Sequence, residues 1–403
     1  MSMPPERQCV LFVDDEPRLL EGIVRMLRPQ REQWEVLTAG GGMAALELME
    51  RQTVDLLVSD MRMPDLSGVQ LLGITAERHP QTVRFLLTGQ SDRESLLNSV
   101  GLTHRFLTKP CDPEILRGAI AGAFALREHL AAPELRSLIC HMGALPSLPE
   151  VWIRIRAELN RPNPSMLAIG DAIAQDIGVT AKLLQLVNSA CFGMNHPVTS
   201  PHEALALLGI DMVRSLVLAG HVFSTCKLED TALDAAALWR HSVGIAAGAR
   251  AACQAAGLTP GDADTAATAG LLHDCGMLIL ASRLPREFAA AQALAREQDL
   301  DAAVAEQKAI GTDHAALGAA LLALWGLPDQ LVEAVLFHHA PPPATMGPLA
   351  AVHLAQCAVA AGTGLSHSHQ VHADPAWLAG LGAPDQVAGW QAAAAAAIAR
   401  SHR

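Results

Sequence analysis

The first third of the chain alternates short β-rich runs with helical stretches, and this alternation restricts the fold more than any other feature of the sequence. Five runs predict strands, at residues 9–13, 35–38, 55–59, 83–87 and 104–108. The stretches between and after them predict helices at residues 17–27, 43–50, 68–78, 93–99 and 113–127. Repeated βα units of this kind predict a doubly wound, five-stranded parallel sheet covered by helices.

Beyond residue 126 the strand patterns end, and helical patterns separated by proline-containing breaks continue through the rest of the sequence. A chain of 403 residues is also longer than one ordinary hydrophobic core supports. We therefore predict two domains of different class. They are an α/β domain at residues 6–128 and an all-α domain at 140–350. A connector at 129–139 joins them, and a helical extension of the all-α domain follows at 351–403.

The composition argues against several classes of protein. The net charge is −12, and neither part of the chain has the basic excess that a nucleic-acid-binding surface needs. The longest apolar runs are shorter than the roughly 20 residues that cross a bilayer, and the first residues do not form a secretory signal. The eight cysteines are scattered and form no C-x-x-C pair. We expect a cytoplasmic protein with reduced thiols that contacts neither membrane nor nucleic acid directly.

Polar residues follow four of the predicted strands at their carboxyl ends. Asp14 and Asp15 follow the first strand and Asp60 the third, while Thr88 and Lys109 follow the fourth and fifth. Because the carboxyl ends of parallel strands share one edge of the sheet, these side chains are expected to meet there. Three carboxylates together require a cation, and Mg²⁺ is suited to bridge them to an incoming phosphate.

This arrangement predicts phosphoryl transfer. Asp60 can act as a nucleophile on phosphorus, while Lys109 and the metal neutralise charge on the transferred group. The Thr88 hydroxyl can donate a hydrogen bond to a phosphoryl oxygen. Taken singly, these residues also fit helix caps, turns and solvated surface. Their position at the ends of four strands favours the phosphoryl-transfer interpretation.

The motifs at these positions resemble those of response-regulator receiver domains over residues 8–127. They are Val13-Asp14-Asp15-Glu16-Pro17, Ser59-Asp60-Met61-Arg62-Met63-Pro64, Gly68, Leu87-Thr88-Gly89 and Thr108-Lys109-Pro110. The resemblance implies a flavodoxin-like fold and phosphorylation of Asp60 by a sensor histidine kinase in a phosphorelay. It implies Mg²⁺ binding by Asp14, Asp15, Asp60 and the backbone carbonyl of Arg62. It further implies that Thr88, Phe106 and Lys109 sense the phosphoryl group, and that the Lys109-Pro110 bond is cis.

The helical part contains six residues with the side chains of a divalent-metal site. They are His241, His273, Asp274, His314, His338 and His339. Imidazole and carboxylate ligands from several helices can hold a divalent ion, and a metal-bound water can attack a phosphodiester. The long gaps between these residues fit hydrogen-bonded histidines in a helical core equally well. Both interpretations stay open on spacing alone.

Residues 140–350 resemble an HDOD domain, the HD-related output domain often attached to receivers. The motifs are Leu145-Pro146-Ser147-Leu148-Pro149, Leu186-Val187-Asn188-Ser189-Ala190, Ala204-Leu205-Ala206-Leu207-Leu208-Gly209, Trp239-Arg240-His241-Ser242, Gly270-Leu271-Leu272-His273-Asp274-Cys275-Gly276, Gly311-Thr312-Asp313-His314, Trp325-Gly326-Leu327-Pro328 and His338-His339. One departure from this family is Asp176-Ile177-Gly178, where the usual sequence is Asp-Pro.

Catalytic HD-superfamily phosphohydrolases, including the HD-GYP cyclic-di-GMP phosphodiesterases, use a similar series of histidines and aspartates. This chain differs from them at Met277, where their motif has lysine, and at Gln356, near the place of a closing aspartate. It also lacks a Gly-Tyr-Pro segment after His338-His339. The resemblance therefore implies a degenerate catalytic site that keeps some metal ligands.

The sequence thus predicts a response regulator in which phosphorylation of Asp60 controls a non-enzymatic output domain that acts by binding a protein. The expected partners are a sensor histidine kinase and a downstream protein that the sequence does not identify, and a homodimer also fits. The alternative is a phosphorylation-regulated, metal-dependent phosphohydrolase acting on a cyclic dinucleotide. Two divalent ions per output domain, lost in His273→Ala, would favour this alternative.

Overall fold

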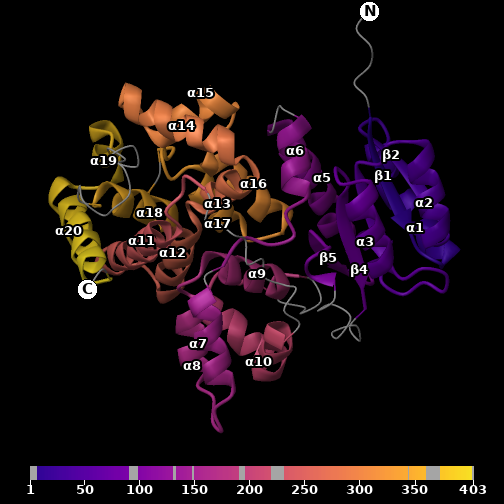
Figure 1. Cartoon of the computed structure of the whole chain (residues 1–403), viewed down its shortest axis with the longest axis horizontal. Coiled ribbons are helices and arrows are strands. Elements are labelled where there is room, and N and C mark those ends of the chain that lie inside the picture. Colours follow the sequence, from indigo (N-terminus) through magenta and orange to yellow (C-terminus); the bar gives the residue numbers. More distant parts are fainter. Residues whose placement is uncertain are drawn as a thin grey trace, which may run out of the picture. The chain divides into compact units, whose positions relative to one another are not determined.

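The computed structural model describes residues 7–89, 99–129, 133–147, 149–189, 196–218, 231–343, 345–359 and 373–401. These residues divide into two compact units. Figure 1 shows the chain coloured by position in the sequence. The first unit comprises the described residues of three segments, Met1–Gly143, Gln185–Asn195 and Ala323–Gly326. The second unit comprises the remaining described residues.

The first unit is built on a five-stranded parallel sheet. Its strands are β1 (Gln8–Val13), β2 (Trp34–Ala39), β3 (Leu56–Asp60), β4 (Val83–Thr88) and β5 (Arg105–Thr108), in the order β2-β1-β3-β4-β5. Every residue of β3 and β4 is buried, as expected for parallel strands covered on both faces. The predicted doubly wound sheet is confirmed, and the strand bounds differ from the predicted ones by one residue or less.

Helices follow the strands, as the βα pattern predicts. They are α1 (Pro17–Leu27), α2 (Gly42–Arg51), α3 (Gly68–Arg78) and α5 (Pro113–His129), with a short 3₁₀ turn at Arg28–Gln30. Helix α1 buries Leu20, Ile23 and Leu27, which share one helical face. The helix predicted at residues 93–99 lies almost wholly outside the described residues.

The start of α3 explains how the chain turns closely after Asp60. Ser67 and Gln70 form a reciprocal capping box that fixes the first turn of the helix. A Cβ atom on Gly68 would lie only 2.0 Å from the carbonyl oxygen of Asp60. Only glycine fits this approach, so α3 begins directly against the end of β3.

The predicted connector contains a helix, α6 (Pro133–Cys140), that is fastened to the sheet within the first unit. The Arg84 guanidinium on β4 donates a hydrogen bond of 3.0 Å to the carbonyl oxygen of Cys140. The His104 ring, just before β5, accepts from the Arg84 amide at Nδ1 and is 2.8 Å from the same carbonyl through Nε2. Burial lowers the pKa of Arg84 to about 10.

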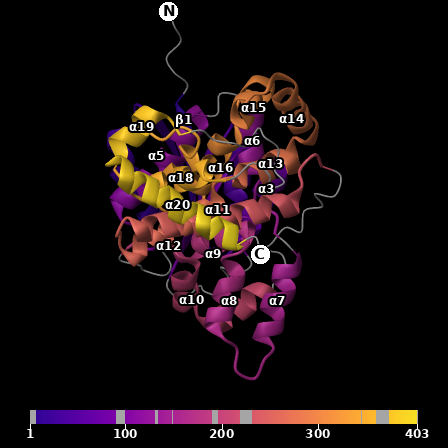
Figure 2. The same ribbon diagram turned by 90° about the vertical axis from the view of Figure 1, so that its left-hand side faces the viewer.

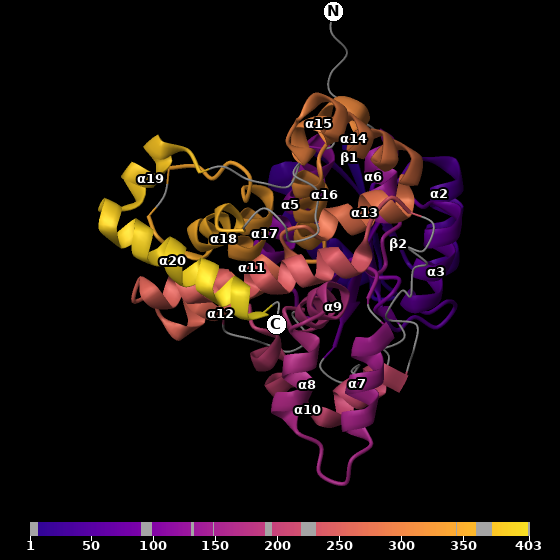
Figure 3. The same ribbon diagram turned by 60° about the vertical axis from the view of Figure 1, so that its left-hand side comes forward.

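The described residues after Cys140 form helices and loops, which confirms the predicted all-α class. The helices are α7 (Pro149–Leu159), α8 (Met166–Ile173), α9 (Ile177–Val187), α10 (Pro201–Leu218), α11 (Ala235–Ala255), α12 (Pro260–Leu272), α13 (Cys275–Arg283), α14 (Pro285–Gln298), α15 (Ala302–Ile310), α16 (His314–Leu324), α17 (Asp329–Leu336), α18 (Pro348–Cys357), α19 (Pro375–Leu381) and α20 (Pro384–Ser401). Helix α11 contacts α12, α18 and α20, and Figures 2 and 3 show α20 lying along it.

One stretch of the described chain, Pro260–Arg283, is long and apolar enough to span a membrane by length and composition alone. It comprises α12, a short break and α13, and nearly all of it is buried. A core helix of a soluble protein passes the same test, so the stretch is weak support for a membrane span.

Candidate functional sites

The three predicted carboxylates meet at the carboxyl edge of the sheet. One oxygen from each of Asp14, Asp15 and Asp60 lies within 4.8 Å of the other two. Asp14 and Asp60 are buried, whereas Asp15 is exposed. The cluster therefore reaches solvent on the side of Asp15, which leaves a path for a hydrated ion or a phosphodonor.

Lys109 connects the two buried carboxylates. Its Nζ is 2.5 Å from Asp14 Oδ2 and 2.7 Å from Asp60 Oδ1, and the bond to Pro110 is cis. Burial raises the pKa of Asp60, although the hydrogen bond and charge of Lys109 act against this. Burial works against the ammonium as well, but hydrogen bonds to Asp14 and Asp60 raise the pKa of Lys109 above its ordinary value.

The residues present fit Mg²⁺. With the carboxylates ionised, three anions face one ammonium, so negative charge remains in excess for a divalent cation to balance. Carboxylate oxygens are also the hard ligands that Mg²⁺ prefers. Arg62 lies in the loop after β3 with its side chain exposed, and its carbonyl remains a predicted ligand.

The predicted sensing residues lie on the neighbouring strands. Thr88 ends β4, is fully buried, and its hydroxyl makes a long 3.5 Å hydrogen bond to the Leu107 carbonyl. Phe106 is buried on β5, two residues before the end of that strand. Thr88 is beside Lys109, because it pairs with Thr108 and its carbonyl accepts from the Lys109 amide at 2.9 Å. Phe106 lies three residues before Lys109 and pairs with Leu86.

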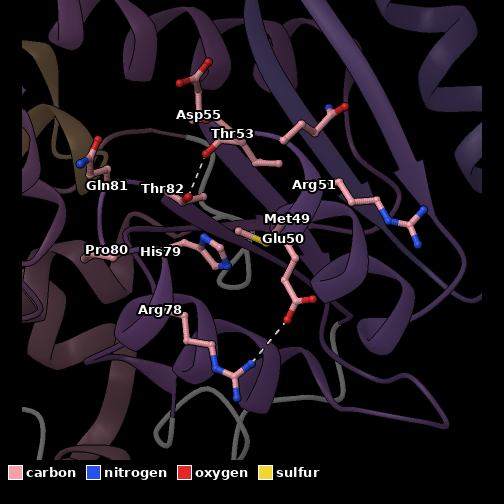
Figure 4. Close-up of a pocket in the computed structure, with 12 residues that line it drawn as sticks. Met49, Glu50, Arg51, Thr53, Asp55, Arg78, His79, Pro80, Gln81 and Thr82 are labelled. Atoms are coloured by element: carbon pink, nitrogen blue, oxygen red, sulfur yellow. Dashed lines mark hydrogen bonds and ion pairs between the residues drawn. The ribbon is translucent and has the colours of Figure 1, made fainter.

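The first unit also has a pocket of about 400 Å³ at the opposite edge of the sheet, shown in Figure 4. Its lining includes Asp55, just before β3, and Thr82, just before β4, so it lies at the amino ends of these strands. Glu50 and Arg78 form an ion pair of 3.9 Å here, with both side chains mostly exposed. Exposed pairs of this kind contribute little stability.

The six metal-type residues of the helical part also come together. His241 is on α11, His273 and Asp274 lie between α12 and α13, His314 begins α16, and His338 and His339 follow α17. They form two groups, one of His241, His273 and Asp274 and the other of His314, His338 and His339. We call these six residues the histidine cluster. Ligand atoms within each group are no more than 4.8 Å apart.

Asp274 joins the two groups. Its Oδ2 is 3.0 Å from His273 Nε2 and 3.7 Å from His241 Nε2. Its Oδ1 is 3.3 Å from His314 Nε2 and 3.5 Å from His338 Nε2. The single carboxylate is therefore surrounded by imidazole nitrogens on both of its oxygens. Burial alone would raise the pKa of Asp274, yet His273 and the hydrogen-bonding imidazoles hold it well below its usual value.

Backbone carbonyls fix the outer nitrogens, Nδ1, of two rings in the cluster. His273 Nδ1 is 2.7 Å from the Gly270 carbonyl, and His338 Nδ1 is 2.7 Å from the Val335 carbonyl. A carbonyl can only accept, so each Nδ1 donates, and in the neutral ring Nε2 presents a lone pair. Both Nε2 atoms are buried, and within the described part of the chain each faces the Asp274 carboxylate, at 3.0 Å from His273 and 3.5 Å from His338. Outer nitrogens held in this way, with inner lone pairs converging, are typical of histidines that bind metal.

His314 is held by a residue that the sequence did not single out. Glu306 Oε2 on α15 accepts from His314 Nδ1 at 2.7 Å and from the His314 amide at 2.8 Å. Burial opposes the charge, but Glu306 and Asp274 raise the pKa of His314 well above its usual value. Its Nε2 is 2.8 Å from Nε2 of His339, whose pKa burial lowers well below its usual value. The two Nε2 atoms are thus within hydrogen-bonding distance, and the tautomers of the two rings decide which one donates.

His353 is a second residue that the motifs missed. It lies on α18, is buried, and its Nδ1 is 2.7 Å from the carbonyl oxygen of His338. The ring therefore supports the backbone that positions the His338-His339 pair.

The two departures from the catalytic pattern are both buried. Met277 is on α13 and Gln356 on α18. The Gln356 Oε1 has no hydrogen-bond partner among the described residues. Neither side chain brings a charge. Asp274 is the carboxylate within the cluster, while Glu306 contacts it through His314 and Asp301 through His339.

Comparisons with known proteins agree with this division of the chain. Residues 10–121 match the family model of the response regulator receiver domain, and residues 145–341 match that of the HDOD domain. The chain is therefore a response regulator, in which a receiver domain precedes an HDOD domain.

Individual relatives cover parts of the chain. An uncharacterised protein of Treponema pallidum is 29% identical over 211 residues, which is 50% of this chain and 39% of the relative. The response regulator protein PilR of Pseudomonas aeruginosa is 36% identical over 122 residues, 30% of this chain and 27% of PilR. Among solved structures, the MmoQ response regulator of Methylococcus capsulatus is 24% identical, with a TM-score of 0.46, and the match covers 61% of this chain and 98% of MmoQ.

Proposed function

We propose that a sensor histidine kinase phosphorylates Asp60 and that this modification switches an HDOD output domain that acts by binding a protein. The observation that carries the proposal is the convergence of Asp14, Asp15 and Asp60 with Lys109 at one open edge of the sheet. A cytoplasmic location, where a kinase domain can reach the site, belongs to the same proposal.

In the proposed transfer, a carboxylate oxygen of Asp60 forms a bond to phosphorus while the bond from phosphorus to the donor atom breaks. Lys109 already contacts Asp60 and can follow the new anion with its ammonium. Mg²⁺, held by the three carboxylates and the Arg62 carbonyl, would neutralise charge on the transferred group. Thr88 can exchange its long bond to Leu107 for a bond to a phosphoryl oxygen.

The route from this site to the output domain begins at β4 and β5. Thr88 and Phe106 lie on these strands, and Arg84 and His104 tie the same strands to the last residue of α6. A shift of β4 or β5 on phosphorylation therefore acts directly on α6, which leads into the HDOD domain along the chain. This linkage supports the proposed coupling.

The test is labelling with acetyl phosphate and Mg²⁺, followed by capture of partners from the source cell with phosphorylated and unphosphorylated protein. We expect labelling on Asp60 and at least one partner whose capture depends on it. Partners that bind equally to both forms and to the Asp60→Asn variant would contradict phosphorylation control.

A second candidate function is a metal-dependent phosphohydrolase, favoured by the buried, converging lone pairs of His273 and His338 around Asp274. The cluster residues would hold the ion or ions, which supply charge and a polarised water in enzymes of this class. Against hydrolysis stand the neutral side chains of Met277 and Gln356. We expect the cluster to bind a divalent ion without supporting turnover.

The deciding assay incubates phosphorylated and unphosphorylated protein with cyclic di-GMP and Mg²⁺, Mn²⁺ or Fe²⁺. We expect no turnover above that of His273→Ala. Turnover that disappears in His273→Ala would establish the phosphohydrolase in place of the protein-binding output.

A further inference from the structure

A pocket of about 690 Å³ lies next to the histidine cluster in the second unit. Its walls come from the segment after α17 and from α18 and α19, elements that can be followed in Figure 3. His339 belongs to both features, because its Nε2 contacts His314 in the cluster while the residue also lines the pocket. The volume is in the range of sites that bind small molecules.

Two aromatic rings are held rigidly in this pocket. The indole of Trp377 and the imidazole of His353 meet edge to face, with ring centroids 4.8 Å apart. Trp377 Nε1 donates to the Pro342 carbonyl at 3.1 Å, and Trp377 packs against an apolar cluster that includes Leu354 and Leu381. Both rings are thus positioned before any ligand arrives, which reduces the entropic cost of binding.

The described residues that line this pocket carry a negative charge. Asp374 is the one charged side chain among the described lining residues, and its Oδ1 caps α19 by accepting from the Ala376 amide. Outside the lining, Asp301 Oδ2 is 3.6 Å from Nδ1 of the lining residue His339. An anionic ligand would find no lysine or arginine among the described lining residues.

We propose that this pocket binds a small organic cation, whose ammonium group contacts the Trp377 ring and is balanced by Asp374. Aromatic faces attract such cations through the ring quadrupole, and a nearby carboxylate adds charge complementarity. The prolines and alanines of the remaining wall suit an apolar body attached to the cation. The HDOD domain would then receive a chemical signal independently of Asp60.

The test compares two probes of nearly the same shape, choline and its uncharged analogue 3,3-dimethylbutan-1-ol, by calorimetric titration of the full-length protein. We expect choline to bind about tenfold more tightly, in line with the magnitude of cation–π contacts. Trp377→Leu should remove this preference. Equal binding of the two probes, or no binding of choline at tens of millimolar, would overturn the proposal.

Asp374→Asn removes the negative charge and keeps the N-cap of α19, because asparagine caps a helix as well as aspartate does. This variant should weaken choline several-fold and leave the neutral analogue unchanged, even if Trp377→Leu folds poorly. Asp385→Asn, in the first turn of α20, removes a charge elsewhere and serves as the matched control. An unchanged choline affinity in Asp374→Asn would exclude Asp374 as the counter-ion.

Discussion

The two candidate sites of this protein bring ionisable side chains together in opposite ways. At the receiver edge, three carboxylates have one ammonium between them, and the exposed Asp15 leaves the cluster open to solvent. In the HDOD domain, four buried imidazoles surround the carboxylate of Asp274, and the less buried His339 contacts one of them, His314. The open receiver edge, with its excess negative charge, suits a metal ion and a phosphoryl group that bind and dissociate readily. The closed histidine cluster suits an ion that dissociates slowly.

The two sites also differ in which groups balance the charge of their carboxylates. At the receiver edge Lys109 supplies the counter-charge through a flexible side chain that can move when a phosphoryl group arrives. In the histidine cluster the carboxylates of Asp274 and Glu306 face His314 and raise its pKa well above the usual value, although burial opposes the charge. Because histidine binds metal in its neutral form, binding of an ion there would couple to pH and to the stability of the domain.

The largest expected effect is at the receiver edge. Asp60→Asn should abolish phosphoryl incorporation from acetyl phosphate and Mg²⁺, because an amide oxygen is a poor nucleophile and does not form the acyl phosphate. Intact-protein mass spectrometry measures the gain of the phosphoryl mass. Glu50→Gln, at the opposite edge of the sheet, removes a carboxylate without touching the site and should label normally. Labelling of Asp60→Asn at the parental level would place the acceptor elsewhere.

Asp274→Asn should nearly abolish metal retention by the histidine cluster, since the one carboxylate that contacts both groups is lost. The measurement is elemental analysis after loading with Zn²⁺ or Mn²⁺ and dialysis. Labelling of Asp60 should be unaffected. If the parent protein also retained no metal, the cluster would be a set of hydrogen-bonded core histidines, and the contrast between the two sites would need another explanation.

Glu306→Gln should weaken metal binding by the cluster about 10- to 100-fold, the usual effect of removing a carboxylate that orients a histidine ligand. The variant keeps an oxygen that can accept from His314 Nδ1, so the fold should persist. Competition with a coloured chelator gives the affinity. Glu297→Gln on α14 is the matched control on an exposed position. Equal affinities in the two variants would show that Glu306 does not orient His314.

Lys109→Ala should have the smallest effect on the stability of the protein. The side chain is partly exposed and contacts carboxylates at the edge, so its removal leaves the core intact. The melting temperature should stay close to that of the parent, while phosphorylation no longer changes partner binding. Thermal denaturation and the capture assay measure the two properties. A variant that fails to fold would make Lys109 a structural residue.

Sequence reasoning succeeded where local pattern determines position. Asp14, Asp60, Thr88 and Lys109 are at strand ends, and parallel strands place all such ends at one edge. The histidine cluster was predicted by residue type only, because the packing of helices decides whether distant residues meet. The structure brings all six residues together, but their roles remain predictions.

Other features had no local signal. Glu306 is a carboxylate within a largely apolar helix, and His353 and Trp377 meet only because α18 and α19 pack against the segment after α17. The attachment of α6 to Arg84 and His104 depends on a backbone carbonyl, which any residue at position 140 would provide. Contacts of this kind are set by tertiary packing, not by a motif.

Coupling between Asp60 and the HDOD domain can be measured by hydrogen–deuterium exchange. The full-length protein is compared with and without beryllofluoride, a stable phosphoryl mimic, in the presence of Mg²⁺. We expect altered exchange in α6 and in peptides of the HDOD domain, and no such change in Asp60→Asn. Changes confined to residues 7–129, or equal changes in Asp60→Asn, would contradict this coupling.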